Sequence, residues 1–278
     1  MSEATLLEHA GRGEHIREQQ EARIRSVYAH RDQSGKRALY AWSNPDVLLN
    51  VYRFHAVAAA CLRRAGLDDL SGLRVLDVGC GSGGWLRQLL AWGASVENLH
   101  GIDLLADRID RARQLAPKID HRVGSGWQLP FDSAAMNLVT AHTVFSSILD
   151  ADARQSLAAE MLRVVAPQGS ILIFDFRISH PRNRNTIGIR KSEIRRLFPG
   201  FELDSHSLEL APPIARKIAP VAPVVALALE ALCPLLRTHS MHLLQRVRLN
   251  GAAILPRDAP CPSKMAVAET QPESSERG

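Results

Sequence analysis

Short apolar runs alternate with longer stretches of helical periodicity from residue 71 onward. Apolar runs with the length and the branched side chains of buried strands cover 73–78, 98–103, 119–123, 136–142 and 169–176. Between them, apolar positions recur at helical spacing over 84–92, 105–115 and 150–165. Continuous apolar strands that alternate with helices predict an α/β fold, with a mostly parallel sheet covered by helices on both faces.

The pattern continues past this core and also precedes it. Residues 190–198 predict one more helix, and 201–210 and 240–249 predict two strands that pair antiparallel at the sheet edge, making seven strands. Near the N-terminus, 14–30 is charged and helix-forming. A second helix is expected to begin at Asn44-Pro45-Asp46 and to end at Gly66, since proline favours the first helical turn and glycine follows the last.

These elements divide the chain into three parts. Residues 1–70 are expected to form a helical cap, and 71–250 a core domain with a lid or insertion at about 211–236. Residues 251–278 are rich in Pro, Ser, Glu and Ala and are expected to be a disordered tail.

Composition narrows the class of protein. The 278 residues carry a formal charge of +5, which agrees with an acidic substrate, a nucleic acid or an anionic surface without selecting among them. Cys61, Cys80, Cys233 and Cys261 show no spacing of a metal site or a redox pair, and the first ten residues lack the apolar stretch of a secretory signal. We therefore expect a cytoplasmic protein with reduced cysteines and no bound metal.

The stretch VLDVGCGSGGW, residues 75–85, carries the main chemical signal. A glycine-rich turn after a parallel strand lies at the sheet edge where such folds bind nucleotides. Gly79, Gly81 and Gly84 satisfy the dinucleotide pattern G-x-G-x-x-G, with Asp103 about 20 residues further on, so an NAD(P)-dependent oxidoreductase is one candidate. Asp77 argues against it, because a carboxylate aimed into the crevice would repel a diphosphate. It would favour S-adenosylmethionine, whose sulfonium and ammonium groups are cationic.

The run D-V-G-C-G-S-G resembles the first motif of class I S-adenosylmethionine-dependent methyltransferases. Further stretches are similar to later motifs of that family in the family's order: GID, LPFDSAAMNLV, EMLRVVAPQGSILIFD and IRRLFPGFEL. The resemblance covers about residues 71–250. It implies a Rossmann-like methyltransferase fold and S-adenosyl-L-methionine as the cofactor, and the small-molecule type is the most similar.

The resemblance also implies a set of cofactor contacts. Asp103 would hold the ribose hydroxyls, and Ser125 and Trp127 would meet the adenine in place of the acidic residue usual after the third strand. The full set expected to bind the cofactor is Asp77, Gly79, Cys80, Gly81, Gly83, Asp103, Leu104, Ser125, Gly126 and Trp127. The structural alternatives are a plain tight turn for the glycines and helix caps for Asp77 and Asp103.

Two residues at strand ends are candidates for catalysis. A methyl transfer mainly needs its partners positioned, and a hydroxyl acceptor is helped by a general base. His142 ends the fourth strand and is the candidate base; its alternative is a histidine that packs beneath the cofactor. Asp175 ends the fifth strand and could orient His142, act as the base, or pair with Arg177.

The segment 177–196 is strongly basic and is expected to rim the acceptor pocket. Arg177 and Arg182 are the candidates for holding a phosphate or carboxylate of the substrate. The run lacks the aromatic residues that stack on nucleic-acid bases, which disfavours a nucleic-acid partner. The apolar segment 211–236 predicts a helical lid or a homodimer contact, with a membrane that carries a lipid-linked acceptor as the third interpretation.

Together these observations predict methyl transfer from S-adenosylmethionine to a small-molecule oxygen on a sugar or natural product, with acidic or glycan-linked acceptors included. An RNA methyltransferase and an NAD(P)-dependent oxidoreductase are the alternatives. A cofactor-binding interaction protein without catalysis is a third.

Overall fold

The computed structural model describes residues 3–33, 38–39, 41–180 and 183–246. All of these residues belong to one compact unit. The tail expected at 251–278, Cys261 and Arg182 lie outside the described residues.

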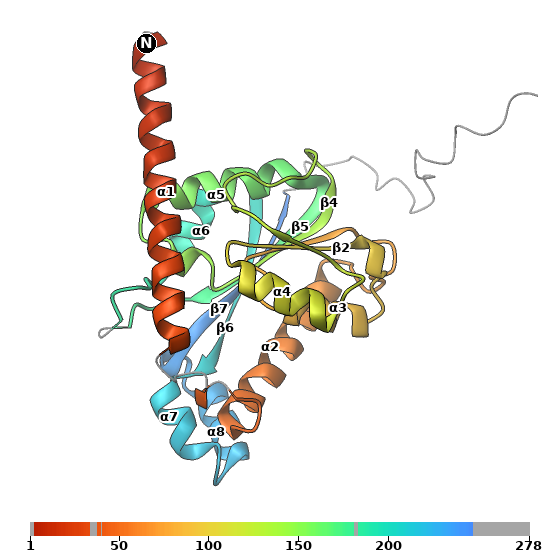
Figure 1. Ribbon diagram of the computed structural model, residues 1–278. Helices are drawn as coiled ribbons and strands as arrows, with labels where there is room; N and C mark the ends of the chain where they lie inside the picture. The colour runs from red at the N-terminus through yellow and green to blue at the C-terminus, as the bar shows by residue number, and fades with distance from the viewer. Residues whose placement is uncertain (1–2, 34–37, 40, 181–182, 247–278) are drawn as a thin grey trace, which may run out of the picture. The chain divides into compact units, whose positions relative to one another are not determined.

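One seven-stranded sheet organises the chain, in the order β3-β2-β1-β4-β5-β7-β6 (Figure 1). The strands are β1 Val75–Val78, β2 Leu99–Asp103, β3 Asp120–Val123, β4 Met136–His142, β5 Val165–Phe176, β6 Phe201–Leu210 and β7 Arg237–Arg246. The first five pair in parallel, and β7 runs antiparallel between β5 and β6. The predicted fold, a mostly parallel α/β sheet, is therefore confirmed.

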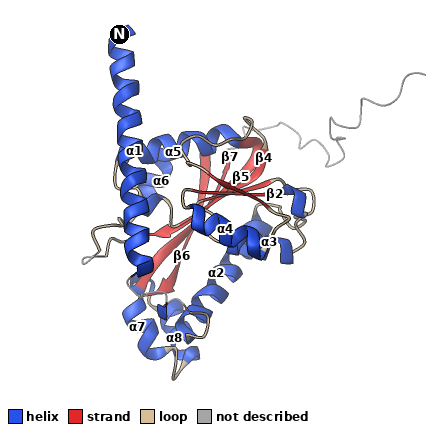
Figure 2. Cartoon of the chain, viewed as in Figure 1, coloured by secondary structure: helices blue, strands red, loops and turns tan. Residues whose placement is uncertain are grey.

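Helices cover both faces of the sheet (Figure 2). On one face, α2 Pro45–Arg64, α3 Gly84–Ala91 and α4 Ala106–Leu115 share a core with Val75, Leu99 and Leu138. On the other face, α5 Ala151–Val164 and α6 Lys191–Leu197 pack with Leu76, Val78 and Val139. Alternate residues of each strand point to opposite faces, so the continuous apolar runs supply both cores.

Helix α1 and strand β5 differ from the expected boundaries, and β7 begins at Arg237, three residues before the expected start at 240. Helix α1 spans Glu3–Gln33, well beyond 14–30. Strand β5 begins at Val165, directly after α5 and before the expected start at residue 169. Val165 is buried and pairs with Met136, and the register of the β4–β5 pair then shifts before Leu138. Segment 211–236 folds as α7 Pro212–Ile218, α8 Pro223–Leu232 and the short helix η4 Pro234–Leu236, each with proline in its first turn.

Candidate functional site

A pocket opens where the strand order reverses, beyond the carboxyl ends of β1 and β4. Ligands of open α/β sheets bind at such switch points. Its walls come from the ends of β1, β2 and β4, from the loop after β3, and from α1, α4 and α5. The lining residues are Ile24, Tyr28, Val78, Gly79, Asp103, Leu104, Leu105, Arg108, Gly124, Gly126, Trp127, His142, Thr143, Val144, Ser147, Ile148 and Leu157.

The glycine turn forms the floor of this pocket. Gly79, Gly81 and Gly83 all have positive φ, at 72°, 54° and 73°, which glycine adopts without steric cost. A Cβ at Gly79 would lie 2.6 Å from Val144 Cγ2, so backbone and loop approach as closely as glycine permits. Cys80, Gly81 and Gly83 lie behind the lining residues and shape the turn, and the Cys80 thiol packs against Gly101.

Asp103 ends β2 and ties the turn to the next loop. Its carboxylate accepts hydrogen bonds from the backbone N–H groups of Gly81, at 2.8 Å, and Leu105, at 2.9 Å. Burial raises the pKa of Asp103 above its ordinary value, while these two amides oppose the shift. A carboxylate at the rim of a nucleoside-sized pocket can accept hydrogen bonds from paired hydroxyls.

Asp77 lies deeper than the pocket wall. Its side chain is 2 % exposed and accepts a hydrogen bond from Thr140 Oγ1 at 2.7 Å, across the β1–β4 pair. Burial raises the pKa of Asp77 to about 7. The carboxylate therefore acts on the pocket from beneath Val78 and Gly79 and does not line it.

The loop after β3 supplies another wall. Gly124, Gly126 and Trp127 line the pocket. Ser125 Oγ accepts the Trp127 backbone N–H at 3.2 Å, and the Trp127 indole N–H donates to Ala153 O at 2.7 Å. The indole is thus fixed on α5 with its ring against the pocket, whereas the Ser125 hydroxyl organises the turn and is not a lining group.

Helix α1 closes one side of the pocket. Ile24 and Tyr28 line the pocket, and the Arg108 guanidinium lies over the Tyr28 ring at 4.4 Å. Gln20 Oε1 accepts the Leu149 N–H at 3.1 Å, and Arg23 donates to Ser147 O. The sequence did not predict that Ile24, Arg108 and most of the loop after β4 line the pocket. Apolar periodicity marks these positions only as parts of helices or of the core.

Comparison with known proteins identifies the domain. A family model described as a methyltransferase domain matches residues 75–169. The chain is 31 % identical over 160 residues to a glycine/sarcosine/dimethylglycine N-methyltransferase of Actinopolyspora halophila, covering 54 % of this chain and 28 % of that one. It is 32 % identical over 146 residues to methyltransferase adrK of Penicillium rubens, covering 44 % and 53 %.

A solved structure agrees in fold. The geranyl diphosphate C-methyltransferase of Streptomyces coelicolor A3(2) superposes with a TM-score of 0.55 at 15 % identity, covering 74 % of this chain and 86 % of that one. Residues 75–169 therefore form a methyltransferase domain, and the fold is that of the class I S-adenosylmethionine-dependent methyltransferases. The chain spans about a quarter and about half of the length of its two named sequence relatives.

The pocket of this methyltransferase domain suits S-adenosylmethionine. Asp103 offers a carboxylate for the ribose hydroxyls, and Leu104, Trp127 and Leu157 offer an apolar wall for the adenine. When ionised, the buried Asp77 places negative charge below the turn, which favours a cationic ligand. These residues would hold S-adenosylmethionine.

His142 connects the pocket to a cluster of rings on the α2 face. Its imidazole lies edge-on to Phe54 at 5.0 Å and to Trp85 at 5.3 Å, and 6.4 Å from Phe174, between ring centroids. His142 Nε2 and Trp85 Nε1 are both buried without a hydrogen-bond partner. Burial, and to a lesser degree the neighbouring His55, lower the pKa of His142 to about 3, so the ring is neutral at physiological pH.

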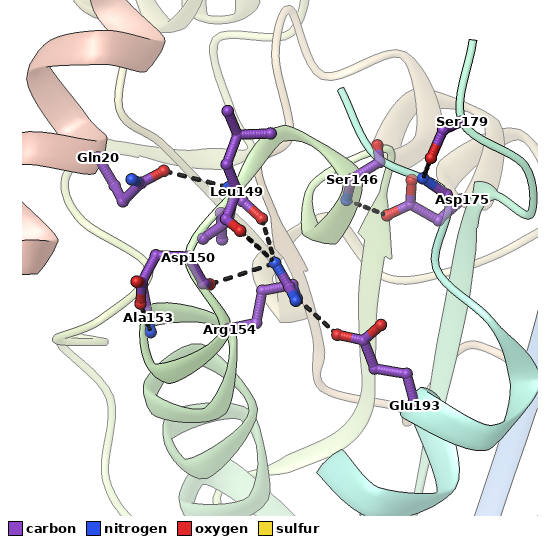
Figure 3. Close-up of polar contacts among 11 residues, drawn as sticks. Gln20, Ser146, Leu149, Asp150, Ala153, Arg154, Asp175, Ser179 and Glu193 are labelled. Carbon is purple, nitrogen blue, oxygen red and sulfur yellow. Dashed lines mark hydrogen bonds and ion pairs between the residues drawn. The ribbon is translucent and has the colours of Figure 1, made fainter. Parts of the chain in front are cut away.

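Asp175 is engaged by backbone amides. Its carboxylate accepts the N–H group of Ser146 at 3.1 Å (Figure 3). It also accepts the N–H group of Phe176 at 2.8 Å. Burial raises the pKa of Asp175 to about 6. In this arrangement Asp175 holds the loop after β4, and it bonds neither His142 nor Arg177. The Arg177 guanidinium donates to Pro234 O at 2.9 Å, away from the pocket lining.

The loop after β4 is anchored by a second buried charge. Arg154 Nη1 donates to the carbonyl groups of Ile148, Leu149 and Asp150, and its Nε lies 2.7 Å from Glu193 on α6 (Figure 3). Because Ser147 and Ile148 line the pocket, this ion pair sets the position of one wall.

Proposed function

We propose that this protein transfers a methyl group from S-adenosylmethionine to the hydroxyl of a small-molecule acceptor, a sugar or natural product, held at His142. The observation that carries the proposal is that Trp85 Nε1 and His142 Nε2, two of the six buried side-chain atoms without a partner among the described residues, lie on neighbouring rings. Buried polar atoms ordinarily have partners, so such a pair is typical of a site that a ligand or a water completes.

The two groups complement a hydroxyl. The Trp85 indole can only donate, while neutral His142 with its proton on Nδ1 presents a lone pair at Nε2. A hydroxyl can accept from Trp85 and donate to His142 at the same time. The surrounding rings of Phe54 and Phe174 favour an acceptor whose hydroxyl is attached to an apolar body.

His142 would orient the acceptor oxygen and receive its proton. Bound S-adenosylmethionine supplies a methyl group on a positively charged sulfur. The neutral thioether would be the leaving group, and the acceptor's proton, made strongly acidic as the oxygen is methylated, would pass to the weakly basic His142 Nε2. Positioning supplies most of the rate, since the donor is already activated.

The test compares cofactor binding with acceptor turnover in the full chain. Trp85→Phe keeps an aromatic ring and removes the N–H. We expect the acceptor KM to rise about tenfold, the cost of one buried hydrogen bond, with the dissociation constant of S-adenosylhomocysteine unchanged by calorimetry. Trp92→Phe is the matched control, because Trp92 packs edge-on against Trp85 in the same ring cluster.

Label transfer from methyl-labelled S-adenosylmethionine to a panel of phenols, sugars and amines identifies the acceptor class. Transfer to amines alone, or salt-dependent binding and methylation of RNA, would replace the hydroxyl proposal. If Trp85→Phe abolishes S-adenosylhomocysteine binding and leaves acceptor KM unchanged, the assignment of Trp85 fails.

Finer predictions from the sequence stay proposals. An acidic or glycan-linked acceptor would need a basic contact, for which Arg177 is proposed; its Nη1 donates to the Pro234 carbonyl. Arg182 is proposed for the same role from the sequence alone. A cytoplasmic location, a homodimer and the division at residue 70 are likewise predictions.

A further inference from the structure

Large apolar side chains that face solvent are concentrated in two segments. Among the described residues, ten of the fourteen such side chains fall within 39–52 and 221–235, so their distribution is far from even. They are Leu39, Trp42, Leu48, Val51, Tyr52, Val221, Val224, Val225, Leu232 and Leu235. Trp42, Val221, Leu232 and Leu235 are each at least 78 % exposed. Patches of this kind mark interaction surfaces.

The two segments meet at one end of the fold. Leu49 of α2 packs into a small core with Ala215, Ala219 and Ala226 of the α7–α8 region. In Figures 1 and 2, α7 and α8 lie beside the N-terminal end of α2. We call residues 41–53 together with 211–237 the apolar tip. Its outward side chains stand on a packed base and are held in fixed positions.

The exposed charges of the apolar tip are positive, and its carboxylates are buried. Its two carboxylates, Asp46 and Glu230, are 7 % and 2 % exposed. Asp46 pairs with Arg216 at 3.7 Å, and Glu230 pairs with Arg53 at 3.2 Å. Within these two described ranges, the exposed charged residues are Arg216 and Lys217. The tip therefore offers apolar side chains beside positive charge and no exposed carboxylate.

This combination selects one partner. We propose that the apolar tip docks this protein on the surface of an anionic lipid bilayer. Helices with an apolar face and flanking cations lie in the interface of such membranes. Trp42 and Tyr52 have the amphipathic rings favoured at that depth. Arg216 is compensated by Asp46, but self-association through the tip would bring Lys217 of two copies together, which disfavours a second copy as the occupant.

The contact would be peripheral. None of the described helices is long and apolar enough to cross a bilayer, and α8 is only 10 residues, about 15 Å, in length. Strand β6 runs in the same direction as β5, so α7, which follows β6, starts at the sheet edge where the pocket opens. Docking would therefore hold the pocket edge of the sheet toward the lipid. Membrane docking is a property separate from the proposed methyl transfer.

The test is co-sedimentation of the full chain with vesicles. One set contains phosphatidylcholine alone and the other contains phosphatidylcholine mixed with phosphatidylglycerol. We expect binding to the anionic set, weakened by added salt. Val224→Glu/Leu235→Glu should lower the partition coefficient about tenfold or more. The matched control Leu115→Glu/Val123→Glu places the same charges at exposed apolar sites away from the tip and should bind as the unaltered protein does.

Lys217→Glu tests the electrostatic contribution to vesicle binding. It should reduce the preference for vesicles that contain phosphatidylglycerol and leave the affinity for S-adenosylhomocysteine unchanged. Equal binding by the tip variant and its control would overturn the proposal, as would failure to sediment with either vesicle. So would a dimer, found by analytical ultracentrifugation without lipid, that Val224→Glu/Leu235→Glu converts to monomer. None of these outcomes depends on methyl transfer.

Discussion

The Asp103 carboxylate accepts the backbone N–H of Gly81 at 2.8 Å, so the acid that ends β2 also fixes the glycine turn that follows β1. Its other oxygen accepts the Leu105 N–H at 2.9 Å. The residue expected to bind ribose is therefore already part of the pocket wall before any ligand enters. Cofactor affinity and turn geometry depend on the same side chain.

Replacing Asp103 should weaken both cofactor binding and the hydrogen bonds that hold the glycine turn. Asp103→Asn leaves one acceptor oxygen for two amide donors and turns an NH₂ group toward one of them. We expect a loss of about 1.5–3 kcal/mol in unfolding free energy, the value of a hydrogen bond to a charged group, and weaker S-adenosylhomocysteine binding. Urea denaturation and calorimetry measure the two effects. Asp107→Asn, on the first turn of α4 and outside the pocket lining, is the control.

The strand ends could be predicted from the sequence because they depend on local pattern. The expected strand 136–142 matches β4 residue for residue, since its apolar run is bounded by polar and turn residues. Of the expected cofactor residues, Gly79, Asp103, Leu104, Gly126 and Trp127 line the pocket. These residues lie at strand ends, which a parallel sheet gathers at one edge.

The partners of buried polar groups could not be predicted. Asp77 faces Thr140 because β1 pairs with β4, and that register depends on the whole sheet. The contact of Asp175 with the Ser146 amide depends on how the loop after β4 folds back, and the contribution of α1 depends on its docking. Tertiary packing decides such contacts, and residue spacing carries no signal for them.

Asp77 should make stability depend on pH. Its pKa rises from 3.8 in the unfolded chain to about 7 in the fold, so the folded state binds more protons between these values. The contribution of Asp77 to stability is therefore most favourable at low pH and falls as pH rises from about 4 to 7. Asp77→Asn should be more stable than the unaltered protein at pH 8, by an amount of the order of 4 kcal/mol. The difference should shrink toward pH 5, as chemical denaturation at several pH values would show.

The same titration should couple to the cofactor. A bound sulfonium favours the ionised carboxylate, so S-adenosylmethionine should release a proton from Asp77 when it binds near pH 6.5. Calorimetry in buffers of different ionisation enthalpy counts that proton. S-adenosylhomocysteine, with a neutral sulfur, should release less, and Asp77→Asn should release none. Equal proton counts for the two proteins would show that Asp77 does not sense the ligand.

Arg154 should be more important for stability than a surface arginine. It is 6 % exposed, pairs with Glu193 and donates to three carbonyl groups of the pocket loop. Arg154→Met leaves Glu193 and those carbonyl groups unpaired, and we expect a loss of about 3–5 kcal/mol. Arg111→Met, at an exposed hydrogen bond to Gln114 on α4, should cost less than about 1 kcal/mol. Equal losses measured by urea denaturation would contradict this ranking.

Gly79 should tolerate no side chain, for two separable reasons. Its φ of 72° disfavours any residue with a Cβ by about 1–2 kcal/mol, and that Cβ would lie 2.6 Å from Val144 Cγ2. Gly66→Ala supplies the backbone cost alone, because Gly66 has a φ of 73° and a Cβ there would meet no packed atom within 4 Å. Gly79→Ala should lose more stability than Gly66→Ala. Adding Val144→Ala should recover the difference and leave the backbone cost, as a double-mutant cycle measures. If Val144→Ala recovers nothing, the close approach of the loop to the glycine turn does not limit this position.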